Sequence, residues 1–173
     1  KKHIDEISKN NLESIDTKKL DIKKSETDIK NYQKDIDDTT AEKAKLQKQI
    51  LDEVAVNSRY KKLHTMEAKL ENTCSKHKKD LKFFETYDDC PTCQQAIDKA
   101  FKSEMIDKKK IKVDEIESGM QQLEKEIVTT ETRLKKINDT MILIREQELL
   151  INRFQTSINE IQKYIAKINR EIE

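Results

Sequence analysis

The sequence predicts an all-α fold, a long antiparallel coiled-coil hairpin, on three observations. Charged residues make up 40% of the 173 residues, against about 25% in an average globular domain. The chain contains one Gly, one Pro and no Trp, so it lacks the residues that form frequent tight turns. Apolar residues recur with a seven-residue period over most of the chain, which is typical of helices that pack along a narrow seam.

The apolar repeat of the first half consists mainly of isoleucines. Its members are Ile15, Ile22, Ile29, Ile36 and Ile50, with Tyr32 and Leu46 at the intermediate positions. Polar residues occupy the other seam positions, which predicts a loose coil: Lys18, Ser25, Thr39, Lys43 and Glu53. The repeat then shifts phase near residues 51–60 and continues at Val56, Tyr60, Leu63, Leu70, Cys74, Leu81 and Phe84. We expect this shift to change the local winding of the helix without ending it.

The apolar repeat of the second half is more regular. Its members are Val113, Ile116, Met120, Leu123, Ile127, Thr130, Leu134, Ile137, Met141 and Ile144. After a second phase break over residues 145–150, it resumes at Ile151, Phe154, Ile158, Ile161, Ile165, Ile168 and Ile172. Gly119 lies inside this helix and should cost it about 1 kcal/mol relative to Ala. The repeats therefore predict two long helices that share one seam.

The only proline predicts where the chain turns. Pro91 cannot continue a helix from the preceding turn, and it favours an extended conformation at Cys90. Thr92 and Gln95 have the spacing of a capping box, which predicts the start of the returning helix. A continuous parallel dimer would instead keep the proline inside a helix, at a cost of about 3 kcal/mol. We therefore favour the hairpin.

The turn divides the chain into three predicted parts. They are an ascending helix over residues 1–87, a turn over residues 88–93 and a descending helix over residues 94–173. With the turn as pivot, Ile29 should lie near Phe154 and Ile50 near Leu134. Phe83, Phe84 and Tyr87 precede the turn and either close the end of the coil or offer contact area to a partner.

Charge and composition exclude several classes of function. The 35 Lys and Arg balance the 34 Asp and Glu, and the two signs alternate, which is typical of solvated helix faces and not of a nucleic-acid footprint. No apolar stretch is long enough to span a membrane, and no signal peptide is evident. One glycine cannot supply a phosphate-binding loop, and no catalytic group stands out, so we expect no enzyme activity and no small-molecule substrate. Three cysteines favour a reducing, cytoplasmic compartment.

The Cys90-x-x-Cys93 pair at the turn is the one motif with metal-binding potential. Such a turn brings two sulfurs to one side of a tight bend, and structural zinc prefers four such ligands in a tetrahedron. One turn provides two, so we expect the same turn of a second chain to provide the rest, with one zinc ion per two chains. If the returning helix begins here, its dipole and free amides should favour the thiolate of Cys93.

Three alternatives remain open for this motif. Cys74 and His77 could join Cys90 and Cys93 in a single-chain site, although a continuous helix would hold Cys74 roughly 24 Å from Cys90; we therefore expect Cys74 in the seam. The turn could belong to a purely structural coiled coil, with or without a disulfide, or to a redox pair. His64 and His77 are expected to be ordinary helix residues. His3 carries no signal.

An antiparallel coiled coil with Cys-Pro-x-Cys at its apex resembles the zinc hook of the SMC-like DNA double-strand-break repair ATPases, the SbcC family, and the stretch from Tyr87 to Ile97 is most similar to the bacteriophage members. The resemblance implies that Cys90 and Cys93 are the zinc ligands. Members of the family often have Gly directly after the second cysteine, where this chain has Gln94.

The resemblance also implies a larger protein around this chain. Its ATP- and Mg²⁺-dependent head would be formed by segments outside this sequence. It would act in DNA repair and recombination with a metal-dependent nuclease subunit, in a cytoplasm that is the host's if the protein is of phage origin. The two hooks would tether two such molecules.

Overall fold

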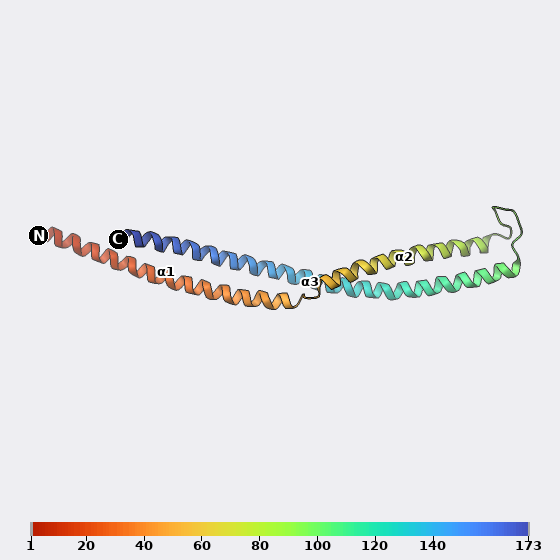
Figure 1. Ribbon diagram of the computed structural model, residues 1–173, viewed down its shortest axis with the longest axis horizontal. Coiled ribbons are helices and arrows are strands. Elements are labelled where there is room, and N and C mark those ends of the chain that lie inside the picture. The colour runs from red at the N-terminus through yellow and green to blue at the C-terminus, as the bar shows by residue number, and fades with distance from the viewer. Residues whose placement is uncertain (1, 173) are drawn as a thin grey trace. The chain divides into compact units, whose positions relative to one another are not determined.

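The computed structural model describes residues 2–172, with the side chains of residues 2–5, 7 and 8 left aside, and consists of three α-helices (Figure 1). They are α1 (Lys2–Lys48), α2 (Glu53–Thr86) and α3 (Lys99–Ile172). Both α1 and α2 pack against α3, and no strand is present in this part of the chain, which confirms the all-α prediction. None of the described helices is long and apolar enough to cross a membrane.

The chain divides into two compact units, and α3 contributes one half to each. The first, called here the α1 unit, comprises Lys1–Leu51 and Asn138–Glu173. The second, called the α2 unit, comprises Asp52–Ile137 and contains the loop between α2 and α3. Each unit is therefore a pair of helices that share one seam.

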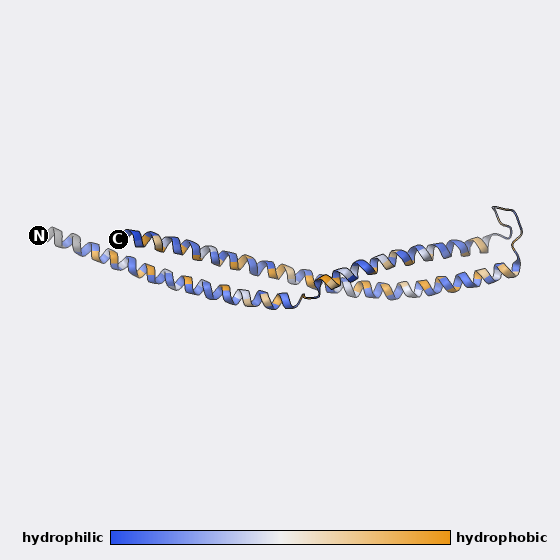
Figure 2. Ribbon diagram, in the orientation of Figure 1, coloured by the Kyte–Doolittle hydropathy of each residue, from blue (hydrophilic) through white to orange (hydrophobic). Residues whose placement is uncertain are grey.

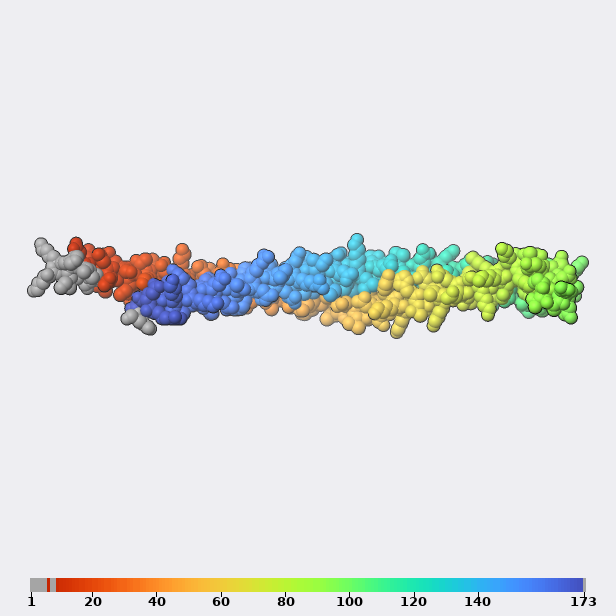
Figure 3. Space-filling model, turned by 90° about the horizontal axis from the view of Figure 1, so that it is seen from above, coloured from red at the N-terminus to blue at the C-terminus, as the bar shows by residue number. Residues whose placement is uncertain are grey.

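The α2 unit is an antiparallel helix pair with a thin apolar core. Leu63 packs with Leu123 and Ile127 in a buried cluster, and Tyr60 and Leu70 cover it. Ion pairs cross between the two helices, and their partners on α3 come earlier in the chain as those on α2 come later, as an antiparallel pair requires: Arg59–Glu126, Lys78–Glu117 and Lys109–Asp80. The space-filling view shows the two helices in contact along their length (Figure 3).

The α1 unit has its buried residues on α3. Ile144, Ile158 and Ile168 are each less than one tenth exposed, whereas the facing residues of α1 are only half-buried. The ring centroids of Tyr32 and Phe154 lie 5.8 Å apart across the seam. Two ion pairs flank that contact, Lys18–Glu171 at 3.2 Å and Lys43–Glu148 at 2.9 Å.

The residues of the predicted seam are the ones that the structure removes from water. Every apolar member of both repeats that is named above is buried or half-buried. Hydrophobic residues recur at intervals along mostly hydrophilic helices (Figure 2). The ring of Tyr32 lies against that of Phe154, about one helical turn from the predicted neighbour Ile29. The loop between α2 and α3 extends beyond residue 93, which moves the pivot.

The predicted continuity of the first helix is wrong, because α1 ends at Lys48 and α2 begins at Glu53. The chain forms a tight turn directly after α1, in which Gln49 N donates to Leu46 O at 3.0 Å. The seam residues Ile50 and Val56 are six positions apart, which would place them about 120° apart around a continuous helix. Ending the helix allows both of them to be half-buried.

An arginine–carboxylate pair stands at the start of α2. Arg133 Nε donates to Asp52 Oδ2 at 2.9 Å and its Nη2 donates to Oδ1 at 2.5 Å. This hydrogen bonding from Arg133 lowers the pKa of Asp52 from its ordinary value of 3.8. The stabilisation is therefore present above pH 3.8 and is lost as the pH falls through the lowered pKa.

We expect Arg133→Gln to lower the thermal midpoint at pH 7 and to have little effect at a pH well below 3.8. Circular dichroism melts of both proteins over a pH series measure the difference. Lys135→Gln removes a charge from an exposed neighbour and should leave the midpoint nearly unchanged. An equal effect of Arg133→Gln at both pH values would contradict the linkage.

We expect Gly119→Ala to stabilise the chain by about 1 kcal/mol, because Ala has the higher helix propensity. A Cβ built at Gly119 meets no atom within 4 Å, so no steric cost opposes the gain. Urea denaturation followed by helix ellipticity measures the change. Ser118→Ala, at the exposed adjacent position, should give about half that gain, and a destabilised Gly119→Ala would disprove the interpretation.

Candidate metal centre

The loop that carries the two cysteines runs from Tyr87 to Asp98, and it is called here the cysteine loop. Tyr87 is extended and ends α2, with its amide donating to Phe83 O at 3.1 Å. Asp98 starts α3, because its Oδ1 accepts the amide of Phe101 at 2.9 Å. The loop is therefore longer than the predicted turn over residues 88–93.

The predicted start of the returning helix at Thr92 is wrong. Residues 91–93 form a turn, and α3 begins only at Lys99. The capping box at Thr92 and Gln95 competes with the Asp98 carboxylate, and Asp is the stronger N-cap residue. As a result Cys93 does not lie at a helix terminus, and the helix dipole does not act on its sulfur.

Backbone hydrogen bonds close the cysteine loop on itself. Asp89 and Ala96 form an antiparallel bridge, beside which Ile97 N donates to Asp88 O at 2.8 Å and Cys90 N donates to Gln95 O at 2.8 Å. Within the turn, Gln94 N donates to Cys90 O at 2.7 Å. These bonds fix the backbone around both cysteines without a strand or a helix.

Hydrogen bonding from loop amides lowers the pKa of Cys90. The amide of Cys93 is the main cause, and the amide of Thr92 acts in the same direction. Hydrogen bonding from the side chain of Cys93 also contributes to the lowered pKa of Cys90. Amides that donate to a thiolate stabilise it in the way that metal-bound cysteines require.

Both thiols are free and accessible. Cys90 is half-buried, and Cys93 is exposed with its Sγ donating to Gln95 Oε1 at 3.7 Å. Two neighbouring sulfurs on one loop can bind the same soft metal ion. Within the part of the chain that the structure describes, no group of three or more His, Cys, Asp or Glu side chains could hold a metal ion.

An ion pair ties the cysteine loop to α3. Lys102 Nζ lies 2.7 Å from Asp88 Oδ1, and the lysine side chain is only 16% exposed. Hydrogen bonding from Lys102 lowers the pKa of Asp88. The negative charge of Asp88, which by itself would oppose two thiolates, is therefore compensated by a neighbour.

The aromatic residues before the loop join the two helices of the α2 unit. Phe84 packs edge-to-face on Phe101 of α3 with centroids 6.1 Å apart, which supports the interpretation that it closes the coil. Phe83 stacks on Phe84 and on Tyr87 at 5.2 and 5.5 Å. Tyr87 remains 45% exposed.

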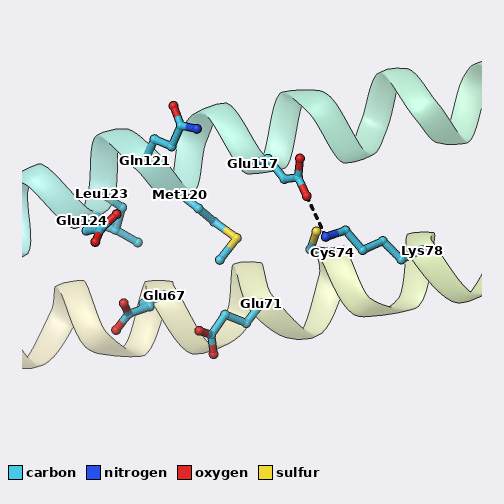
Figure 4. A pocket seen from close by; sticks show the side chains of 9 residues that line it. All are labelled: Glu67, Glu71, Cys74, Lys78, Glu117, Met120, Gln121, Leu123 and Glu124. Carbon is cyan, nitrogen blue, oxygen red and sulfur yellow. Dashed lines mark ion pairs between the residues drawn. The ribbon is translucent and has the colours of Figure 1, made fainter.

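Cys74 lies away from the cysteine loop, as the seam prediction requires. It is 5% exposed and, with Met120, lines an open hollow of about 430 Å³ between α2 and α3. Beside it Lys78 pairs with Glu117 (Figure 4). From Cys74 to the end of α2 at Thr86 is a rise of about 18 Å. The described residues therefore do not form the single-chain site.

The histidines take other partners. His64 Nδ1 lies 2.8 Å from Glu67 Oε2, and its ring meets Tyr60 edge-on. His77 Nδ1 lies 3.4 Å from Lys109 Nζ. The side chain of His3 lies outside the described residues.

The backbone conformation of Gln94 was only partly predicted, since the sequence shows a non-glycine residue at this position but not its φ angle. Its φ is 60°, the one positive value among the non-glycine residues that the structure describes. Glycine adopts this left-handed conformation without penalty, whereas other residues are strained by about 1–2 kcal/mol. The position directly after the second cysteine thus has the conformation that a glycine would favour.

Comparison of the chain with protein-family models, with curated proteins and with solved structures gives no match in any of the three. The resemblance of the cysteine loop to the zinc hook therefore stays a prediction from the sequence.

We expect Gln94→Gly to stabilise the closed conformation of the cysteine loop by about 1 kcal/mol, because glycine adopts the left-handed conformation without strain. Hydrogen exchange of the amides of Cys90 and Ile97, which donate within the loop, should slow by roughly fivefold. Gln95→Gly is the matched control: this position has no positive φ, so the substitution should speed the same exchange. Faster exchange in Gln94→Gly would contradict the strain.

Proposed function

We propose that this chain is a zinc-dependent dimerisation module in which Cys90 and Cys93 from two copies share one zinc ion. The observation that carries the proposal is the closed cysteine loop: Gln94 N donates to Cys90 O at 2.7 Å and Cys90 N donates to Gln95 O at 2.8 Å, and the loop holds two free thiols three residues apart. A closed loop of this kind fixes the backbone of both cysteines before the metal arrives, which lowers the cost of ordering the ligands.

The coordination number of zinc is the reason for proposing a second chain. Structural zinc takes four ligands, and wholly Cys sites are common. The cysteine loop supplies two, and the exposure of Cys93 leaves its sulfur accessible to another molecule. A two-fold pairing of identical loops completes the set with no further ligand type.

The resemblance to the SbcC family supplies the wider proposal. As a zinc hook, the module would join two coiled-coil arms of SMC-like ATPases that act on broken DNA together with a nuclease subunit. The chain itself would tether and would carry no catalytic group. ATP, Mg²⁺, DNA and the nuclease would be bound by other parts of the complex.

The test is zinc content measured together with molar mass in solution. We expect one zinc ion per two chains, and chelation should release the metal and separate the hook-mediated dimer. Cys90→Ser and Cys93→Ser should each reduce zinc binding by at least a hundredfold, because each substitution is present in both copies and leaves two of the four thiolates.

Cys74→Ser is the matched control, since this buried thiol lies in the seam; it should leave zinc stoichiometry unchanged. One zinc ion per isolated chain that is lost in Cys74→Ser would establish the single-chain site instead. A metal-free protein whose mass does not respond to chelator would leave only a structural coiled coil.

A further inference from the structure

An apolar patch lies on the face of α3 opposite the seam of the α1 unit, and it is called here the outer patch. Its four side chains and their exposed fractions are Ile142 (54%), Leu143 (45%), Leu149 (58%) and Leu150 (36%). At about 100° per residue they lie within about 60° of the direction of Glu146. The seam residues Ile144 and Ile151 lie more than about 130° away from it. The phase break that the sequence shows over residues 145–150 thus gives α3 a second apolar face.

Charges of opposite sign frame the outer patch. Asp139 precedes it, Arg153 follows it and Glu146 lies at its centre, and all three are exposed. Asp139 and Arg153 both project within about 20° of the direction of Glu146. Among the residues described by the structure, none forms an ion pair with any of these three. Their charges are therefore available to a partner.

The order of these residues is symmetric about Glu146. Ile142 and Leu150 are equidistant from it, as are Leu143 and Leu149, while the charges of Asp139 and Arg153 are equidistant and opposite. We infer that the outer patch binds the outer patch of a second copy of this chain, with the two α3 helices antiparallel about a two-fold axis at Glu146. A self-complementary surface of this kind is what an isologous interface requires.

Charge complementarity decides the direction of packing. In the antiparallel arrangement Asp139 of each copy faces Arg153 of the other, which gives two favourable pairs. In a parallel arrangement each of these residues faces its own equivalent, and both contacts repel. Glu146 faces its equivalent in either case, so it opposes association without choosing the direction.

The interface is weak and reversible. Four apolar side chains per copy fall short of the roughly 1,200 Å² that stable complexes bury, and exposed ion pairs add little each. The association is independent of the cysteine loop and of any metal. It therefore brings coils together sideways at high local concentration, whether or not the loops bind zinc.

The test is sedimentation equilibrium of the full chain with chelator and reductant present, so that association through the cysteine loop is silent. We expect a dimer at high concentration. Arg153→Asp and Asp139→Arg should each weaken it by about tenfold, because two attractive pairs become repulsive. The double variant Asp139→Arg with Arg153→Asp should restore it to within about twofold. Glu146→Gln should strengthen it by about threefold.

Lys163→Asp makes the same change of charge as Arg153→Asp, but on an exposed part of α3 away from the outer patch. It should have no effect on the dissociation constant. Helix ellipticity checks that each variant remains folded. A chain that stays monomeric at millimolar concentration overturns the proposal. So does a dimer that ignores the single substitutions, which indicates parallel packing or another surface, and so does failure of the double variant to restore association.

Discussion

A single apolar seam, one or two side chains wide, holds each unit together. Only a third of the chain is hydrophobic. Among the described residues, most of the buried ones form a row along α3, with Leu63 and Cys74 on α2, and Ile137 alone is almost wholly enclosed. Neither α1 nor α2 could bury its apolar stripe alone, because most helical stability in proteins comes from packing of that stripe. The position of the cysteine loop depends on the same seam, since Phe84 and Lys102 attach the loop region to α3.

The period of the hydrophobic pattern made most of the fold predictable. Residues such as Leu63, Leu123 and Ile158 could be assigned to the seam from spacing alone, because a side chain faces the same direction every seven residues. The break after Lys48 could not, since a shift of phase can be absorbed either by winding or by ending the helix. The choice depends on whether both Ile50 and Val56 can reach α3, which is a property of the packed pair.

The position of the cysteine pair at a loop between two helices was predictable from the sequence, whereas the structure of that loop was less so. Pro91 and the spacing of Cys90 and Cys93 locate the turn, because proline cannot continue the helix. The start of α3 was misplaced by several residues, since Thr92 and Asp98 both have the chemistry of an N-cap and only tertiary contacts select between them. The hydrogen bonding from loop amides that lowers the pKa of Cys90 was not predicted from the sequence. The sequence contains no pattern that predicts this hydrogen bonding.

Lys18 and Lys43, which lie in the seam of the α1 unit, determine the axial register of the coil, which its isoleucines cannot do. Ile15, Ile22, Ile29 and Ile36 are interchangeable, so a slip of α1 along α3 by seven residues would bury nearly the same surface. The same slip would carry the ammonium groups of Lys18 and Lys43 about 10 Å from Glu171 and Glu148. Polar seam residues thus specify one axial register of α1 against α3 over registers shifted by whole heptads. They do so at the expense of apolar core volume.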